Sequence, residues 1–407
     1  MFDFVKFYLK NSIYFEIKKS QKFWQKKIFE YNNACESFTT LISYLLLMQG
    51  IWLDIESILK LIANNQNISD LHLSAGESIS YRLNWEIVKK EELWKIWDEN
   101  MEILLKQLFK NNPQRYDKFL VDKEADFAYV AKDETAYRVN AYLSTGRLNV
   151  VMRKINSTPR VLEGIMFQNI SDSIKKNVLE TPKGLFLVTG PTGSGKSTSI
   201  VAMLELLNKE KPYKIITIED PIEYVFTPQK CLISQREIWH DTWSFDAALS
   251  SALREDPNVV FVWEIRNIET AEAVLNLAET GHLVFSTLHT NSATHTLNRY
   301  LSFFPSDMQN SILERMADCL VGIMSQNLVR TKDNQWRIWV FELMLNNNAV
   351  KNNLKKREID QMQNIIETST QNGMISMKQY AKKLLERDII NPHDVEWLMN
   401  NKSAPQI

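Results

Sequence analysis

A glycine-rich turn between two apolar segments constrains this chain more than any other feature. The apolar run 185–188 predicts a buried parallel strand, and the periodic stretch 200–207 predicts a helix. Between them, residues 190–197 match the pattern G-x-x-x-x-G-K-[ST] in the strand–loop–helix order that its mechanism requires. Glycines let backbone N–H groups point inward around a phosphate chain, and a helix N-terminus adds partial positive charge. The sequence therefore predicts a phosphate-binding loop (P-loop) rather than a chance glycine turn.

The residues of this loop have separate expected roles. Lys196 is expected to reach the β- and γ-phosphates, and the Ser197 hydroxyl to ligate Mg²⁺. We therefore expect ATP and Mg²⁺ as cofactors. The predicted nucleotide-binding residues are Gly190, Pro191, Thr192, Gly193, Ser194, Gly195, Lys196, Ser197 and Thr198.

The composition of the 407-residue chain argues against several classes of protein. Apolar residues make up 44% and charged residues 24%, as in ordinary globular domains, and a net charge of −1 gives no global basic field for nucleic acid. The cysteines Cys35, Cys231 and Cys319 are far apart, which argues against structural zinc, a metal cluster or a disulfide framework. The longest apolar stretch, 41–53, is too short to span a bilayer. We expect a protein of the reducing cytoplasm.

The order of predicted elements divides the chain into five parts. Residues 51–160 predict a small α+β domain, 161–184 a linker and lead-in, and 185–345 alternate strand and helix as in a parallel sheet with crossover helices. Residues 346–407 predict a helical cap. Residues 1–50 are either an amphipathic extension or upstream sequence that is not expressed. In the largest part, strands are expected at 185–188, 214–218, 258–262 and 283–287.

Acidic side chains follow the strand predicted at 214–218. An open α/β sheet holds its ligands at the carboxyl ends of its strands, and Glu219, Asp220 and Glu223 come at that end. Phosphoryl transfer to water needs one group that orients the nucleophile and another that holds Mg²⁺, and a carboxylate can do either. The alternative is a solvated acidic turn.

Two further strand ends carry polar side chains that suit a nucleotide site. The apolar strand 258–262 leads to Glu264, which is the form of a Walker B motif. The strand 283–287 has His282 before it and His289 after it. A histidine at the nucleotide edge can sense the γ-phosphate or pass a contact to a neighbouring subunit.

Together these motifs resemble the secretion-type hexameric ATPases, and most closely the type IV pilus retraction ATPase family. Residues 219–223 look like the family's Asp box, 256–266 like its atypical Walker B motif and 281–289 like its His box. The signatures 69–76 and 138–141 of the small domain match as well. The resemblance implies an α/β fold: a RecA-like P-loop ATPase core, a smaller N-terminal α+β (PAS-like) domain and a C-terminal helical cap.

The resemblance also implies roles for individual residues. Glu223 would align or activate water, and Glu264 would be the Walker B acid. The two histidines would link the nucleotide to the subunit interface, and two arginines of the small domain would close onto ATP. The expected catalytic residues are Glu223, Glu264, His282, His289, Arg138 and Arg153. The expected metal ligands, direct or through water, are Ser197, Glu219 and Asp220.

The expected function is that of a homohexameric motor that hydrolyses ATP to drive type IV pilus retraction. It would work in the cytoplasm at the inner face of the cytoplasmic membrane, beside a platform protein of the pilus. The alternatives are a pilus assembly or type II secretion ATPase, or a catalytically weak accessory ring subunit. The lack of a four-cysteine module favours retraction over assembly, while a signature only partly kept at 349–354 leaves the accessory role open.

Tryptophan stands at several positions where glycine is expected. The chain has eleven of each, and eleven glycines in 407 residues are well below the usual level of about 7%. Trp85 follows Asn84 where Asn-Gly would form a hairpin turn, and the family resemblance places glycine at Trp239 and Trp263. One hypothesis is that the organism reads one codon as glycine and that this codon is written here as tryptophan. The alternative is that the tryptophans are real and pack in the core or at interfaces.

Overall fold

The computed structural model divides the chain into two compact units, each described here by itself. One holds residues 1–116 and 141–151, and the other holds 117–140 and 152–407. The predicted extension 1–50 lies outside the described residues, and the predicted domain boundaries stay predictions. The structure describes residues 54–63, 68–83, 86–89, 95–110, 112–133, 135–155, 159–333 and 336–399.

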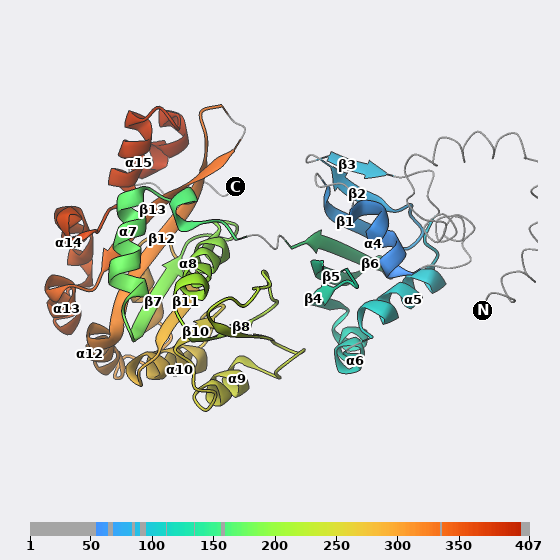
Figure 1. The fold of residues 1–407 in the computed structure, drawn as a ribbon, viewed down its shortest axis with the longest axis horizontal. Helices are drawn as coiled ribbons and strands as arrows, with labels where there is room; N and C mark the ends of the chain where they lie inside the picture. Colours follow the sequence, from blue (N-terminus) through green and yellow to red (C-terminus); the bar gives the residue numbers. More distant parts are fainter. Residues whose placement is uncertain are drawn as a thin grey trace, which may run out of the picture. The chain divides into compact units, whose positions relative to one another are not determined.

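The smaller sheet has six strands in the order β3-β2-β1-β6-β5-β4 (Figure 1, blue to teal). Its strand β4 and the first residues of β5 belong with the second unit. The apolar positions of α4 at Ile55, Ile58 and Leu59 are buried, as their helical spacing predicts. The elements are α4 (Ile55–Ala63), β1 (Ile68–Ser74), β2 (Ser80–Leu83), β3 (Glu86–Lys89), α5 (Asp98–Leu108), α6 (Pro113–Asp122), β4 (Glu124–Val130), β5 (Ala136–Ser144) and β6 (Arg147–Lys154).

The larger sheet has seven strands in the order β13-β12-β7-β11-β10-β8-β9. Its neighbours from β12 to β9 pair in parallel, and β13 pairs antiparallel with β12. The four strands expected in this part of the chain are confirmed as β7, β8, β10 and β11. The strands are β7 (Gly184–Thr189), β8 (Lys214–Glu219), β9 (Leu232–Glu237), β10 (Val259–Val262), β11 (Leu283–Leu288), β12 (Leu320–Arg330) and β13 (Arg337–Leu345).

Helices form most of the crossover connections between the parallel strands, although β8 leads to β9 without one, and this arrangement confirms the predicted RecA-like α/β class. Side chains at Ser244, Asn267 and Ser292 cap α9, α10 and α11 by accepting the backbone N–H three residues on. The helices are α7 (Gln168–Ile174), α8 (Lys196–Glu210), α9 (Phe245–Ala252), α10 (Ile268–Glu279), α11 (Ala293–Leu301), α12 (Gln309–Cys319), α13 (Asn348–Lys355), α14 (Met362–Thr368), α15 (Met377–Glu386) and α16 (Glu396–Met399). Short 3₁₀ and π turns are η2 (Leu162–Gly164), η3 (Lys175–Leu179), η4 (Ile359–Gln361), η5 (Thr370–Asn372) and η6 (Pro392–Val395).

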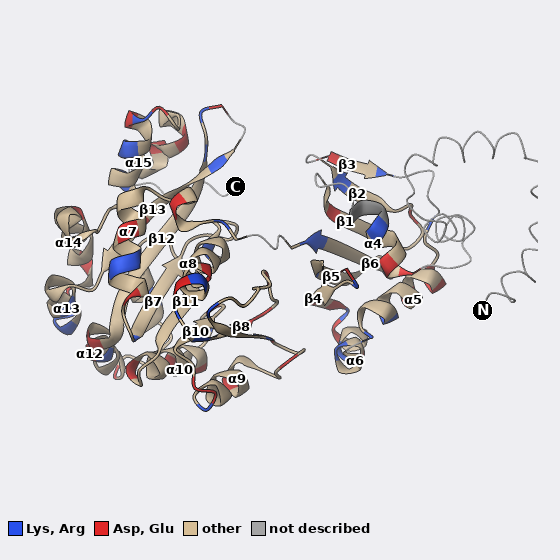
Figure 2. Cartoon of the chain, in the orientation of Figure 1, with Lys and Arg blue, Asp and Glu red and all other residues tan. Residues whose placement is uncertain are grey.

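Acidic and basic residues are interspersed along the helices and strands (Figure 2). Within the described part of the chain, no helix combines the length and the apolar character needed to cross a membrane.

The backbone separates the unusual tryptophans into two kinds. Trp239 has φ +68°, in the left-handed region that bulky residues rarely adopt, whereas Trp263 is not among the positive-φ residues. Glycine is therefore favoured by the backbone at 239 but not at 263. Trp85 lies outside the described residues.

Replacing Trp239 with glycine is expected to leave the protein at least as stable. The left-handed backbone costs a side-chain-bearing residue about 1–2 kcal/mol, while glycine accepts it freely. The change loses a contact in which Lys118 Nζ lies 3.6 Å from the indole centroid, worth about 0.5–1 kcal/mol at an exposed site. The measurement is the melting temperature of Trp239→Gly, compared with that of Trp243→Gly. Trp243 is an exposed tryptophan whose backbone is not in the left-handed region. A lower melting temperature for the change at 239 than for that at 243 would contradict this expectation.

Candidate nucleotide site

The P-loop lies where the sequence places it, between β7 and the first turn of α8. Two of its glycines are required by close contacts as well as by their positive φ. A Cβ at Gly190 would lie 2.2 Å from the backbone oxygen of Gln326, and one at Gly195 would lie 2.7 Å from the indole nitrogen of Trp339. The loop is therefore shaped by strands β12 and β13 beneath it as well as by its own sequence.

Buried polar residues under the loop were not expected from the sequence. The Gln326 side-chain amide donates to the backbone oxygen of Ser194 at 2.7 Å, and the hydroxyls of Thr189 and Ser325 lie 2.8 Å apart. Gln326 and Ser325 are fully buried in β12. Since buried polar groups need partners, a polar pair inside an apolar strand is the signal that could have found them.

Lys196 lies at the start of α8 with its ammonium against the loop. Nζ donates to the backbone oxygens of Gly190 at 2.9 Å and Pro191 at 3.1 Å, and lies 3.4 Å from Nδ1 of His289. Burial lowers the pKa of Lys196 to about 8, although the negative charge of Glu264 opposes the shift. The ammonium is thus weakly solvated and ready to exchange carbonyl partners for phosphate oxygens.

Nucleotide affinity is expected to depend on pH through Lys196. Bound phosphates favour the charged lysine, so its pKa rises on binding, and above pH 8 binding must take up a proton. The Kd for ADP should be nearly constant from pH 7 to 8 and then rise by up to about tenfold per pH unit. Calorimetric titration between pH 7 and 9.5 measures this. A flat Kd over that range would contradict the prediction.

Glu264 follows β10 and is linked to the P-loop through His289. Its carboxylate lies 3.2 Å from His289 Nε2 and 2.9 Å from Arg266 Nε. Burial raises the pKa of Glu264, but hydrogen bonds from these two residues outweigh it and leave the pKa below its usual value. The structure therefore brings the side chains of Glu264, His289 and Lys196 together.

His282 is not part of this group. His282 lies just before β11 and His289 just after it. The two histidines are therefore at opposite ends of this strand, roughly 20 Å apart at the usual rise per residue. His282 Nδ1 lies 3.0 Å from the backbone oxygen of Leu277.

The acids at the end of β8 and just after it have different surroundings. Glu219 is buried, accepts a hydrogen bond from Thr217 Oγ1 at 2.6 Å and one from Gln235 Nε2 at 3.3 Å, and burial raises its pKa to about 7. Glu223 is half-exposed. In the part of the chain that the structure describes, His, Cys, Asp and Glu side chains do not form a group of three suited to a metal ion. The metal-ligand roles of Ser197, Glu219 and Asp220 stay predictions, and the geometry favours Glu219 as a support for the loop that follows it.

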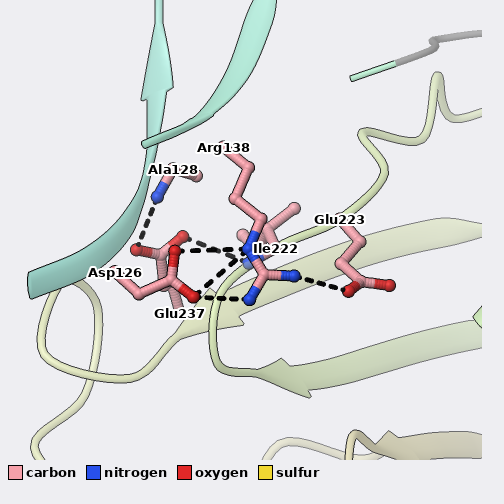
Figure 3. Close-up of polar contacts among 6 residues, drawn as sticks. All are labelled: Asp126, Ala128, Arg138, Ile222, Glu223 and Glu237. Carbon is pink, nitrogen blue, oxygen red and sulfur yellow. Dashed lines mark hydrogen bonds and ion pairs between the residues drawn. The ribbon is translucent and has the colours of Figure 1, made fainter. Parts of the chain in front are cut away.

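Arg138 lies against Glu223 (Figure 3). Its Nη1 donates to Glu223 Oε1 at 3.1 Å, and its Nε lies 3.2 Å from both carboxylate oxygens of Asp126. A hydrogen bond from Arg138 to Asp126 raises the pKa of the arginine. Arg153 lies exposed on β6, and its expected role stays a prediction.

Comparison with known proteins identifies the family of this chain. The family model for type II/IV secretion system proteins matches residues 55–404. The chain is 37% identical over 344 residues to the type IV pilus retraction ATPase PilT of Pseudomonas aeruginosa, which covers 83% of this chain and 96% of that protein. It is 34% identical over 342 residues to the type IV pilus ATPase PilU of the same organism, with 84% and 87% covered.

A solved structure gives the same result for the fold. The pilus retraction motor PilT with bound ADP matches at a TM-score of 0.77 and 34% identity, over 87% of this chain and 98% of that one. Both the sequence and the fold are shared over nearly the whole length of these relatives. The chain therefore belongs to the type II/IV secretion ATPase family and, within it, to the PilT group of P-loop ATPases.

Proposed function

We propose that this chain is the motor of type IV pilus retraction, working as a homohexamer. The observation that carries the proposal is the meeting of Lys196, Glu264 and His289 at the carboxyl edge of one parallel sheet. The similarity to PilT over 96% of that protein supports the same conclusion.

The side chains at this edge divide the work of hydrolysis. The P-loop N–H groups and Lys196 bind the phosphates, and Glu223 orients the attacking water. The Ser197 hydroxyl and the ionised Glu264, acting through water, offer the oxygen ligands that Mg²⁺ prefers. The bound ion would neutralise charge on the phosphates. Arg138 would stabilise the charge that develops on the transferred phosphoryl group.

A ring would explain the position of His282, which lies away from the nucleotide site of its own subunit. Because His282 lies at the sheet edge opposite the P-loop, it can act at a nucleotide only if that nucleotide belongs to a neighbouring subunit. We propose six copies in a ring, at the inner face of the cytoplasmic membrane and beside a platform protein of the pilus. Closing of the small domain over ATP and its opening after hydrolysis would supply the stroke.

Deleting the gene in its own host tests the proposal against its alternatives. A retraction motor is expected to leave cells with more surface pili and no twitching. Loss of pili would indicate an assembly ATPase, and normal pilus numbers with normal twitching would contradict the proposed function. Reduced retraction force with a second retraction ATPase still active would indicate an accessory subunit.

A further inference from the structure

Glu237 is a buried carboxylate that connects two separate segments of the second unit. It is the last residue of β9, and only 2% of it is exposed. One of its oxygens accepts the backbone N–H of Ala128 in β4 at 3.1 Å, and the other accepts the backbone N–H of Ile222 at 3.2 Å (Figure 3). The side chain therefore ties strand β4 to the loop after β8.

Both sides of this connection lead to the pair Arg138–Glu223. Ile222 is bonded directly to Glu223, so the hydrogen bond to Ile222 fixes the backbone from which the Glu223 side chain extends. On the other side, the carboxylate of Asp126 in β4 accepts hydrogen bonds from the guanidinium Nε of Arg138 in β5. The arginine is thus held by β4, and the glutamate is held to β4 through Glu237.

The chemistry of the contact explains why a carboxylate is needed. The N–H groups of Ala128 and Ile222 are partly buried, and leaving such a group without an acceptor costs up to about 1–3 kcal/mol. An ionised glutamate has two acceptor oxygens and no donor, so it can satisfy both N–H groups at once. Glutamine has the same shape but one acceptor and one NH₂ group, so one of the two backbone N–H groups would face another donor.

We propose that Glu237 is a positioning residue that makes the Glu223 loop move together with the strand pair carrying Arg138. In the structure, Arg138 neutralises Glu223. A γ-phosphate that binds Arg138 would compete for the guanidinium and free the Glu223 carboxylate to orient water, with Glu237 keeping that carboxylate in place during the exchange. This inference rests on the proposed role of Glu223 in hydrolysis.

The test compares Glu237→Gln with Glu205→Gln in the full-length ring. Glu205 is also a buried glutamate that joins two segments, accepting from Asn208 Nδ2 and Gln229 Nε2, but it lies in α8 away from the P-loop turn. We expect Glu237→Gln to lower kcat by about tenfold or more, with the Kd for ADP within about twofold of wild type. Glu205→Gln should keep kcat within about twofold, even if its melting temperature falls equally.

A double-mutant cycle separates positioning from a general loss of stability. If Glu237 acts through Glu223, Glu237→Gln should have almost no further effect on kcat in a Glu223→Gln background. Wild-type kcat for Glu237→Gln, or an equal drop for Glu205→Gln, would overturn the inference. If Glu223→Gln itself turned over like wild type, the proposed role of Glu223 would fail first, and the two failures are therefore distinguishable.

Discussion

Glu223→Gln is expected to abolish most ATP turnover while nucleotide binding survives. Removing a group that aligns or activates the attacking water typically costs about 10²–10⁴-fold in rate. The amide has the size of the carboxylate and can still accept the hydrogen bond from Arg138 Nη1, so the loop should keep its place. The phosphates are held by the P-loop, which this change does not touch. Steady-state phosphate release and an ADP titration on the same preparation measure the two quantities.

Glu279→Gln provides the matched control for this experiment. Glu279 has nearly the same exposure as Glu223, 33% against 31%, and is also paired with an arginine, Arg315. It lies at the end of α10 and takes no part in the proposed site. Its turnover should stay within about twofold of wild type, as for most surface changes. Equal turnover in the Glu223 and Glu279 variants would refute the role given to Glu223.

The four strands that the sequence predicts in the larger sheet are largely buried short runs, while the longer strands β12 and β13 are largely buried as well and are not among those predicted. β7, β10 and β11 are apolar runs whose residues are buried. A strand of this kind can be recognised from its composition alone. The sequence does not predict β9, because this strand lies at the edge of the sheet and its residues 232–237 are mostly polar and partly exposed. Its pairing depends on backbone contacts with β8, for which the side chains give little signal.

The candidate site was predictable where chemistry is local and not where it depends on distant contacts. The P-loop is specified by its own glycines and lysine. The place of Glu219 is set by strand alternation, since it shares a face with Thr217, and that pattern could have shown it pointing inward. The opposite positions of His282 and His289 also follow from the strand between them. The contact of Arg138 with Glu223, 85 positions apart, could not be read from local pattern.

Lys196→Ala is expected to remove most nucleotide affinity without unfolding the protein. In the wild type, bound phosphates would replace the carbonyls of Gly190 and Pro191 as partners of the ammonium. Charge-assisted hydrogen bonds are worth about 1.5–3 kcal/mol, so the Kd for ADP should rise about 10–100-fold. Burial already disfavours this charge, as its lowered pKa shows, so the free protein loses little stability when the charge is removed.

Thermal melts with and without ADP test the predicted loss of ADP affinity. A ligand that binds only the folded state raises the free energy of unfolding by RT ln(1 + [L]/Kd), and the melting temperature rises with it. ADP should therefore stabilise wild type strongly and Lys196→Ala only weakly. Lys209→Ala, an exposed lysine later in the same helix, should respond like wild type. If ADP stabilised Lys196→Ala as much as wild type, the phosphates would be bound elsewhere, and the roles given to Glu223 and Glu264 would lose the nucleotide on which they depend.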